Sequence, residues 1–443
     1  MIVNANQSPL ADGIPILGSA AAMLANPILF LTQQYQKHGA VFRIQAANQK
    51  LVAIAGAEAN VFMTKEGTAH FRSWEVWHPQ DTEFGAKQSM ISLDGADHLQ
   101  MRKIQKRAYA RSAVDGRYND ILEIVLTEIN SWQQGQAIGV TAAMKRIVTE
   151  QLGQLTTNTS PREYIPDLLK MVRTMLFVYV TKQYPKFVLL DPGYQKAKKR
   201  VVHFVREMVQ AHRDTTKTRE PDLIDDLIAA QKENPEFIPE QDLLFAAMGP
   251  YIAGLDTAAN ALSFVLWTLH QHPDVLEQVR TEVDTAFASG ELTAQSIRGM
   301  DVLHRVILET LRLYPIAGAL TRTVSKDFEF AGYSIKEGTS VVIGTTVAHF
   351  LPEYYQNPYA FDIERFNSTR AEHRRPGVYV PFGVGSHTCL GAGMAEAIIM
   401  VSVAGIIRHT KLESDPNYKL RIISTPTPSP DDKFALKLVA RRS

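Results

Sequence analysis

The sequence predicts a mainly α-helical fold with a smaller, late β portion, of the α+β class. Helical patterns dominate the middle of the chain, short β-type runs follow, and a lone cysteine stands in a glycine-rich segment near the C-terminus. No repeat or long linker interrupts the 443 residues. We therefore expect one domain, 1–443, with a helical core at about 90–315 and the β portion and cysteine segment at about 316–443.

Composition narrows the possible functions. The 47 basic and 46 acidic residues balance, which argues against a nucleic-acid binder with a broad basic surface. A single cysteine excludes an intramolecular disulfide and a multi-cysteine zinc site. An apolar content of 45% allows a large core that could bury a hydrophobic cofactor.

The N-terminal region has no basic stretch of the secretory type, and residues 13–36 carry no charge. Pro15, Gly18, Asn26 and Pro27 interrupt this stretch, so it is too broken for a spanning helix. We expect a helix at about 27–37, no transmembrane anchor and a cytoplasmic protein.

The longest helical pattern covers about residues 240–271. As one helix it would be about 48 Å long, and it is apolar on most faces, which indicates burial. Gly249 and Pro250 lie inside it, so we expect a kink there. The run ends at His272 and Pro273.

The later elements alternate in type. A helix is expected at about 302–314, ending at Pro315. Residues 328–335 and 340–346 then read as two strands around the turn Lys-Glu-Gly-Thr. A final apolar helix is expected at 391–409.

Cys389 lies among three glycines in the segment F-G-V-G-S-H-T-C-L-G, residues 382–391. Glycine lets a backbone approach a bulky partner closely. A cysteine that opens a predicted helix can be held as a thiolate by the helix dipole. These features permit a metal-ligating thiolate, and a buried, inert cysteine is the alternative.

This segment resembles the haem-binding signature of the cytochrome P450 family. Phe382, Gly385, Cys389 and Gly391 match its fixed positions, and His387 stands where the family usually has Arg. The resemblance runs in register from about residue 90 to the C-terminus. It implies a cytochrome P450 fold with a long central helix, haem buried between that helix and the cysteine loop, and Cys389 as iron ligand. The loop residues that it places against the haem are Phe382, Gly383, His387 and Gly391.

A second motif, Ala253-Gly254-Leu255-Asp256-Thr257, lies inside the long helical run. An acid beside a hydroxyl can act as a proton relay, and Gly254 leaves room for a neighbour against the helix. The motif resembles the oxygen-activation motif of the family, which makes Asp256 and Thr257 the catalytic candidates and Ala253 and Gly254 haem contacts. A Thr and a Gly tolerated in a core helix are the alternative.

A third motif is the pair Glu309 and Arg312, which share one helix face. By resemblance, the pair joins Arg365 in a buried structural network near the haem. An ordinary surface ion pair is the alternative.

His98 and Arg102 also share a helix face, which suits them to anchor a carboxylate. By resemblance, they would bind haem propionates together with Arg322 and His387. A solvated basic helix is the alternative.

The resemblance implies a haem-thiolate monooxygenase that contains heme b (iron protoporphyrin IX) and uses O₂. Its electrons would come from a ferredoxin or flavodoxin with an NAD(P)H-dependent reductase. Lys103, Lys106 and Arg107 could dock that acidic partner, although a solvated helix face fits them equally. We expect a monomer that binds no nucleic acid.

Other activities stay open. A hydrogen-peroxide-driven peroxygenase or a haem isomerase would need no electron partner, but the acid–Thr pair favours the monooxygenase. A haem-based gas sensor is the non-enzyme alternative. A Cys–His hydrolase is disfavoured, because Cys389 and His387 lie only two residues apart and no third orienting group is evident.

The substrate pocket is predicted from position in the family, and its candidate residues are mostly apolar, as is a possible lid at 175–180. This favours a lipophilic substrate such as a terpenoid, steroid or fatty acid. The candidate pocket residues are Trp74, Trp77, Met248, Ile252, Ile316, Ala317 and Gly318, with 425–430 in a late hairpin.

Overall fold

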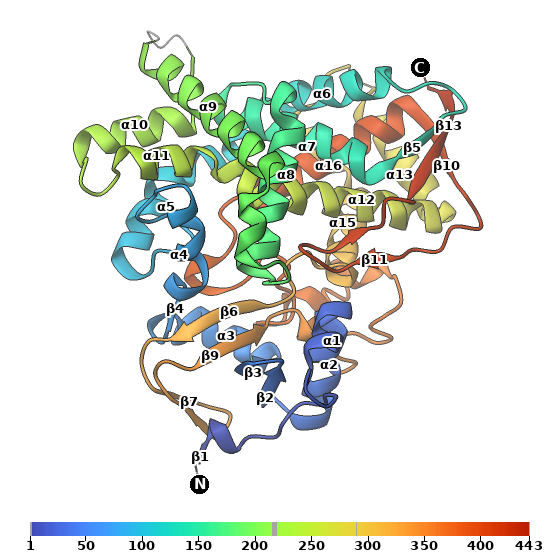
Figure 1. The fold of residues 1–443 in the computed structure, drawn as a ribbon. Coiled ribbons are helices and arrows are strands. Elements are labelled where there is room, and N and C mark those ends of the chain that lie inside the picture. Colours follow the sequence, from blue (N-terminus) through green and yellow to red (C-terminus); the bar gives the residue numbers. More distant parts are fainter. Residues whose placement is uncertain (1, 215–218, 289, 443) are drawn as a thin grey trace. The chain divides into compact units, whose positions relative to one another are not determined.

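The structure is a computed structural model that describes residues 2–214, 219–288 and 290–442. It consists of two compact units, each built from separate stretches of the chain (Figure 1). Unit 1 contains residues 1–82, 88–100 and 311–389, and unit 2 contains residues 83–87, 101–310 and 390–443. The expectation of one domain stays a prediction.

Unit 1 is built on a five-stranded sheet in the order β2-β3-β9-β6-β4. Strands β3 and β9 are parallel, with Val52 opposite Val341, while the other neighbours are antiparallel. One apolar cluster includes Ile54 and Val341, and another includes Phe42 and Val342. Because successive strand side chains point to opposite faces, both faces of this sheet bury apolar residues.

The secondary structure of unit 1 comprises these helices and strands: β1 (Val3–Asn4), α1 (Ala20–Ala25), α2 (Pro27–His38), β2 (Val41–Ala46), β3 (Gln49–Ala55), α3 (Ala57–Lys65), β4 (Phe71–Arg72), β6 (Leu320–Val324), β7 (Phe328–Phe330), β8 (Tyr333–Ile335) and β9 (Ser340–Gly344). Three helices cross the boundary between the units in sequence: α4 (Trp74–Glu83), α5 (Gly95–Tyr109) and α15 (Asp301–Leu313).

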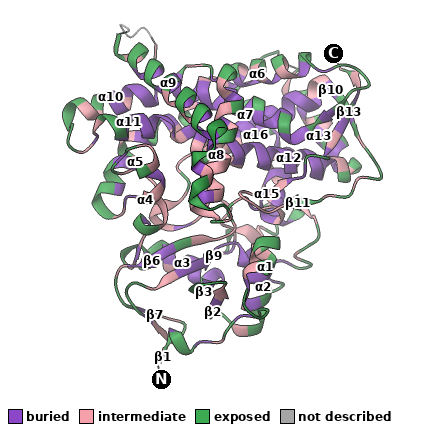
Figure 2. Cartoon of the chain, in the orientation of Figure 1, coloured by how far each residue is buried: buried purple, intermediate pink, exposed green. Residues whose placement is uncertain are grey.

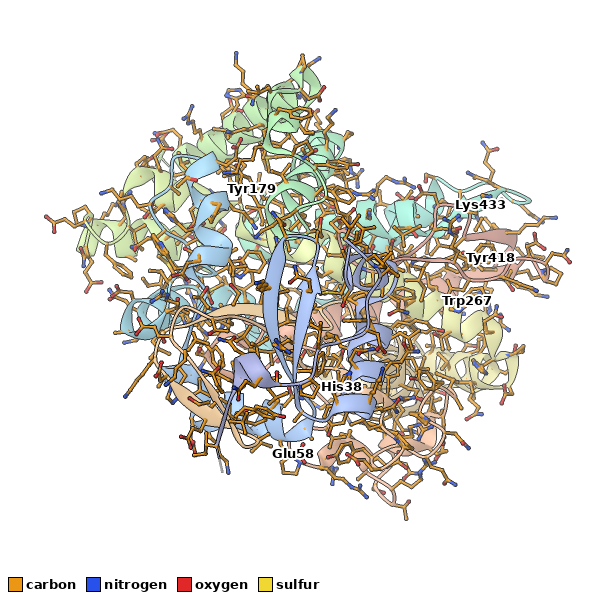
Figure 3. The ribbon with its side chains drawn as sticks, turned by 60° about the horizontal axis from the view of Figure 1, so that its bottom comes forward. His38, Glu58, Tyr179, Trp267, Tyr418 and Lys433 are labelled. Carbon is orange, nitrogen blue, oxygen red and sulfur yellow. The ribbon has the colours of Figure 1, made fainter. Side chains whose placement is uncertain are left out.

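Unit 2 is mainly helical, and its central helix α12 packs against α7 and α16. Both α12 and α16 are almost entirely buried (Figure 2). At one end of this unit Trp267 of α12 meets Tyr418 edge-on, with ring centroids 5.6 Å apart (Figure 3). Such a core lets α12 carry polar groups in a dry environment.

The helices and strands of unit 2 are α6 (Tyr118–Asn130), β5 (Ala137–Gly139), α7 (Val140–Thr157), α8 (Ile165–Met175), α9 (Pro192–Asp214), α10 (Leu223–Glu233), α11 (Glu240–Ala247), α12 (Leu255–Gln271), α13 (Pro273–Ala286), α14 (Ala294–Gly299), α16 (Ala392–His409), β10 (Thr410–Ser414), β11 (Ile422–Ile423), β12 (Ser429–Pro430) and β13 (Ala435–Arg441).

The predicted long helix exists but is not uniform. It consists of α11, a π-helical turn at Pro250–Gly254, and α12. Proline has no N–H to donate, so the regular ladder is broken at Pro250, and a π-helical turn follows. The expected irregularity at Gly249 and Pro250 is confirmed, in the form of this widened turn.

The prediction of one strand at 328–335 is wrong. Residues Ala331 and Gly332 have φ angles of +46° and +82°, and they reverse the chain between β7 and β8. Strand β9 therefore pairs with β3 and β6 rather than with 328–335. Arg322, a predicted propionate ligand, lies within β6, a strand that the sequence pattern did not indicate.

Within the residues that the structure describes, two helical stretches are long and apolar enough to cross a membrane by length and composition, Glu240–Gln271 and Gly385–His409. Their apolar windows are 78% and 67% buried inside the protein. The mostly buried core helix of a soluble protein passes the same test, and α12 and α16 are core helices of unit 2.

Candidate functional site

The cysteine loop of unit 1 is closed by its own backbone. The Cys389 N–H donates to the Phe382 carbonyl at 2.9 Å, and the Thr388 hydroxyl donates to the Gly385 carbonyl at 2.7 Å. Gly383 and Gly385 have φ angles of +77° and +74°, and a Cβ on Gly385 would lie 2.8 Å from the Met63 carbonyl oxygen. Only glycine fits there.

This closed loop leaves Cys389 exposed. Helix α16 begins at Ala392, so the prediction that Cys389 opens the helix is wrong by three residues, and Gly391 is the N-cap. The cysteine sits on a rigid turn just before the positive end of a helix, which stabilises a thiolate. An exposed sulfur on a fixed loop fits an iron ligand and does not fit an inert core cysteine.

A polar cluster surrounds His387 in unit 1. Its Nε2 lies 3.1 Å from Asp94 Oδ1 and 3.2 Å from the Ser73 hydroxyl, and its ring stacks on His98 with centroids 3.9 Å apart. Burial opposes ionisation of Asp94, but hydrogen bonds from His387 and Ser73 and the charge of Arg322 hold its pKa below the usual range. Three predicted propionate ligands, His98, Arg322 and His387, therefore share one cluster with Asp94.

Arg322 is the residue of this cluster that best tests the fit to haem. It is 6% exposed, and among the described residues its guanidinium donates one hydrogen bond, to the Thr321 carbonyl at 2.7 Å. Burial lowers its pKa to about 10, against the charge of Asp94. A buried guanidinium with donors to spare suits a carboxylate ligand, so the residues present fit a haem propionate. Arg102, on the later part of α5, belongs to unit 2.

The acid–alcohol pair of unit 2 has a partner that the sequence did not indicate. Asp256 is 4% exposed, and its Oδ1 lies 2.8 Å from Nζ of Lys145 on α7. The contact is an ion pair without hydrogen-bond geometry, since Oδ1 accepts no hydrogen bond from the described residues. The side chain of Lys145 is 9% exposed, so both charges are buried.

Thr257 bonds back to its own helix. Its hydroxyl donates to the Ala253 carbonyl at 2.7 Å, within the π-helical turn. Ala253 is exposed in a helix whose other residues are mostly buried, and Gly254 lies so close to Leu152 that a Cβ would approach it to 3.0 Å. The turn thus presents an open, small-residue surface beside a hydroxyl, which suits a flat ligand and its oxygen chemistry.

Two residues of the predicted network, Arg312 and Arg365, lie in unit 1 and both donate to backbone carbonyls, whereas Glu309 belongs to unit 2. Arg312 donates to the carbonyls of His349 and Pro358 at 2.7 and 2.6 Å, and its guanidinium lies 4.8 Å from the centre of the Tyr355 ring. Arg365 contacts the same ring. It also donates to the carbonyls of Gln356 and Asn357 and to Glu372. Glu309 is fully buried one turn before Arg312 on α15.

His349 also belongs to this network, and its hydrogen bonds select one tautomer of the imidazole ring. The Val380 N–H can only donate, and it points to Nε2 at 3.0 Å, so Nδ1 carries the proton and donates to the Arg312 carbonyl at 3.3 Å. Burial, and then the charge of Arg312, lower the pKa of His349 to about 3. The ring is therefore a neutral structural group.

The predicted pocket residues differ in their exposure to solvent. Trp74 is 40% exposed and stacks on His78 at 3.8 Å, while Met248 is only 2% exposed. Ala317 is exposed, and the remaining candidates, Trp77, Ile252, Ile316 and Gly318, are of intermediate exposure. Whether they form one pocket stays a prediction.

The basic residues on α5 differ in their contacts. Lys103 and Lys106 are exposed, whereas Arg107 is bonded to Asp226 through two nitrogens. Lys103 and Lys106 therefore stay candidates for docking a redox partner, whereas Arg107 is bonded to Asp226 of α10.

Sequence reasoning missed Lys145, Asp94 and His349. The only sequence signal for Lys145 is a lysine within an otherwise buried helical pattern, because a buried charge requires a partner. Asp94 and His349 carry no such signal, since their partners are distant in sequence.

Comparisons with a family model, with related sequences and with solved structures all find cytochrome P450 proteins. The cytochrome P450 family model matches residues 9–437. A putative cytochrome P450 120 from Synechocystis sp. is 26% identical over 441 residues, which is 98% of both chains. A cyclooctat-9-en-7-ol 5-monooxygenase from Streptomyces melanosporofaciens is 24% identical over 422 residues, 92% of this chain and 90% of the relative. The structure of retinoic acid-bound cyanobacterial CYP120A1 has a TM-score of 0.85 at 24% identity and covers 100% of both chains. This last likeness confirms the predicted fold class.

Proposed function

Because the chain belongs to the cytochrome P450 family, we propose that it is a monooxygenase that inserts one oxygen atom from O₂ into a lipophilic substrate. The haem of this family, when bound, supplies the oxygen activation, and its thiolate ligand favours O–O cleavage. The observation that carries the proposal is the acid–alcohol pair, Asp256 and Thr257, at an opened turn of a buried helix.

Cys389 is the proposed iron ligand. Its loop is fixed by the Cys389 N–H to Phe382 hydrogen bond and by the positive φ angles of Gly383 and Gly385. A rigid loop holds the sulfur in one position and keeps it from collapsing into the core. Arg322, His98, His387 and Arg102 would hold the haem carboxylates.

Asp256 and Thr257 are the proposed proton relay. The Thr257 hydroxyl donates to the Ala253 carbonyl, so its oxygen lone pairs stay available to accept a proton donor. Oδ1 of Asp256 lies 2.8 Å from Nζ of Lys145. Lys145 acts through Asp256 and is therefore a positioning residue: the carboxylate must exchange this contact for water or Thr257 to move a proton.

We further propose a substrate class, a redox partner, a cellular location and an oligomeric state. The pocket candidates are mostly apolar, and two relatives are named for retinoic acid and for cyclooctat-9-en-7-ol. These names support a lipophilic, terpenoid-like substrate. A ferredoxin or flavodoxin with its reductase would supply the electrons, docking on Lys103 and Lys106, and the enzyme would act as a cytoplasmic monomer.

Two measurements test the enzyme class. The reduced, carbon-monoxide-bound protein should absorb near about 450 nm, as thiolate-ligated haem does, and Cys389→Ser should lose that band. Thr257→Ala should consume electrons without forming product in proportion. Unchanged coupling in Thr257→Ala would contradict the relay.

The electron source and the substrate need separate assays. Turnover with a ferredoxin system should exceed turnover with hydrogen peroxide alone, and efficient peroxide-only turnover would favour a peroxygenase. Retinoic acid should shift the Soret band of the haem protein, whereas a short carboxylic acid such as acetate should not. The absence of a shift with retinoic acid, steroids and fatty acids alike would contradict the lipophilic substrate class.

A further inference from the structure

Most of helix α4 in unit 1 is exposed or of intermediate exposure (Figure 2), and the residues that it buries are polar. Gln80 and Asp81 are both 0% exposed. Trp74 is 40% exposed, and Val76 and Trp77 are of intermediate exposure. The hydrophobic effect favours the opposite arrangement in a helix that only packs against a core. The inner side of α4 is therefore built for polar contacts.

Asp81 finds its contacts within unit 1. Its Oδ1 accepts from the Ser89 hydroxyl at 2.8 Å, and the Ser89 N–H donates to the Ser92 hydroxyl at 2.9 Å. These hydrogen bonds tie α4 to the segment that precedes α5. The burial of Asp81 is therefore explained by the fold.

Gln80 has no such explanation. Among the described residues, neither Nε2 nor Oε1 of its buried amide has a hydrogen-bond partner. Three other buried carboxamides, those of Asn60, Gln151 and Asn260, each donate through their nitrogen. Burying an amide without partners destabilises a protein. The amide of Gln80 thus points to a ligand that supplies both a donor and an acceptor.

The start of α4 is fixed to the cysteine loop of unit 1. Ser73, directly before α4, donates its N–H to Asp94 at 2.7 Å, and its hydroxyl lies 3.2 Å from Nε2 of His387. His387 is two residues before Cys389. Gln80 lies about 10 Å further along α4, at about 1.5 Å per residue. The helix that carries Gln80 therefore begins at the predicted propionate cluster.

The face of α4 that carries Gln80 also carries an aromatic ring. Residues three apart are neighbours on a helix, so Trp77, a predicted pocket residue, lies beside Gln80. Binding sites for lipophilic molecules are mostly apolar and contain a few polar groups that fix the orientation of the ligand. Trp77 and Gln80 together have this composition.

We propose that Gln80 binds the hydroxyl group of a lipophilic alcohol and so determines which end of the substrate lies at α4. This inference rests on the proposed function and narrows its substrate class. One hydroxyl can accept from Nε2 and donate to Oε1, which pairs both atoms of the amide. An ether or a carboxylate can only accept, so Oε1 would stay unpaired. A site that leaves a buried polar group unpaired with the wrong ligand rejects that ligand.

The test compares three compounds that share one apolar chain: farnesol, its methyl ether and farnesoic acid. The dissociation constant of each for the full-length haem-loaded protein is measured from the shift of the Soret band. Farnesol should bind about 10- to 100-fold more tightly than its methyl ether. At about pH 7.5, where farnesoic acid is ionised, farnesol should also bind at least about tenfold more tightly than the acid.

The variant Gln80→Met separates a binding role from a structural one. Methionine is unbranched and apolar, so it fills the site without an amide. Gln80→Met should weaken farnesol binding about 10- to 100-fold and change methyl ether binding by less than about threefold. Its unfolding temperature without ligand should equal or exceed that of the parent, because the variant removes a buried amide without partners.

The matched control is Gln34→Met, the same substitution at a second buried glutamine of unit 1. Gln34 is 3% exposed. Its Oε1 accepts from the Asp12 N–H at 2.9 Å, and its Nε2 donates to Asp12 Oδ2 at 3.1 Å. Gln34→Met should lower the unfolding temperature. It should keep the preference for farnesol over the methyl ether within about twofold of the parent.

Two outcomes would overturn the assignment of Gln80 alone. The first is equal affinity of the parent for farnesol and its methyl ether. The second is a Gln80→Met variant that unfolds at a lower temperature and keeps the preference of the parent, since the amide would then be bonded within the protein or to a trapped water. A Soret band that none of the three compounds shifts would instead contradict the proposed lipophilic substrate class, and this inference with it.

Discussion

Buried charge is neutralised in two different ways in the two units. In unit 1, the guanidinium groups of Arg312 and Arg365 donate to several backbone carbonyls and lie against Tyr355. In unit 2, Lys145 instead lies 2.8 Å from a single carboxylate, that of Asp256, without hydrogen-bond geometry. Both sites are nearly dry, with the four side chains at most 9% exposed.

The difference separates a structural role from a functional one. A guanidinium bonded to many fixed carbonyls cannot move without breaking all of those bonds, so it defines the local backbone. A carboxylate with one close ionic contact can exchange that contact for another partner at smaller cost. The comparison predicts stability effects in unit 1 and rate effects in unit 2.

The largest expected effect is a loss of unfolding free energy on substitution of Arg312. Arg312→Ala would remove the Arg312 donor from the buried carbonyls of His349 and Pro358 and should cost about 3–5 kcal/mol of unfolding free energy. Arg312→Lys should recover less than half of this loss, because an ammonium group lacks the planar fork. Denaturant unfolding measures both. Equal denaturant midpoints for Arg312→Ala and the parent would show that Arg312 does not stabilise the fold.

The next effect is expected at Asp256. Asp256→Asn should lower product formation about 100-fold, or about 2.7 kcal/mol, because the amide cannot carry the proton. Its unfolding free energy should fall by less than that of Arg312→Ala, because the Asn amide oxygen can still face Nζ of Lys145 even though the buried ammonium loses its counter-charge. The assay is turnover with electrons in excess, alongside unfolding of the same preparation. A stability loss like that of Arg312→Ala would show that both units use charge in the same way.

A smaller effect is expected at Lys145. Lys145→Met should slow product formation about tenfold, or about 1.4 kcal/mol, and should alter the solvent isotope effect on turnover. Since Lys145 acts through Asp256, the double variant Lys145→Met/Asp256→Asn should be no slower than Asp256→Asn alone. Lys145→Arg is the control and should keep most of the parent rate. Additive losses in the double variant would refute a positioning role.

The smallest effect is a pH dependence at His349. Its folded pKa, about 3, lies below the usual histidine value of 6.5, so below about pH 6.5 the unfolded chain binds a proton that the folded protein excludes. This stabilisation is present above pH 6.5 and is lost progressively as the pH falls toward 3. Between pH 7 and 5.5 the parent should lose about 1 kcal/mol more than His349→Gln, whose amide oxygen can still accept the Val380 N–H.

The control for this measurement is His203→Gln, a change in an exposed helix residue. It should reproduce the pH profile of the parent. An identical profile for His349→Gln and the parent would mean that His349 does not exclude its proton, and that the network tolerates a charged ring.

Much of the fold was predictable because its signals are local. The helix expected at 27–37 is α2, that at 302–314 is α15, and that at 391–409 is α16. The strands were harder to predict. The sequence pattern did not indicate β2 and β3, and it predicted one strand at 328–335, where the structure has β7 and β8. Strand partners are decided by distant segments, and Ala331 adopts a positive φ that its residue type does not indicate.

For the candidate site, residue types were predictable and partners were not. The sequence indicated Cys389, the Asp256–Thr257 pair and the Glu309–Arg312–Arg365 set. It gave no indication that Arg312 would bond to carbonyls 37 to 48 residues away, or that Lys145 would meet Asp256.

The sequence by itself determined the cysteine loop, the broken central helix and the family to which the chain belongs. Those features depend on glycine and proline at fixed positions and on helical spacing, which act within a few residues. Only the tertiary structure decided which group neutralises each buried charge and which nitrogen of His349 holds its proton. These outcomes depend on burial, because the energy of a charge or an apolar side chain is set by what surrounds it after packing.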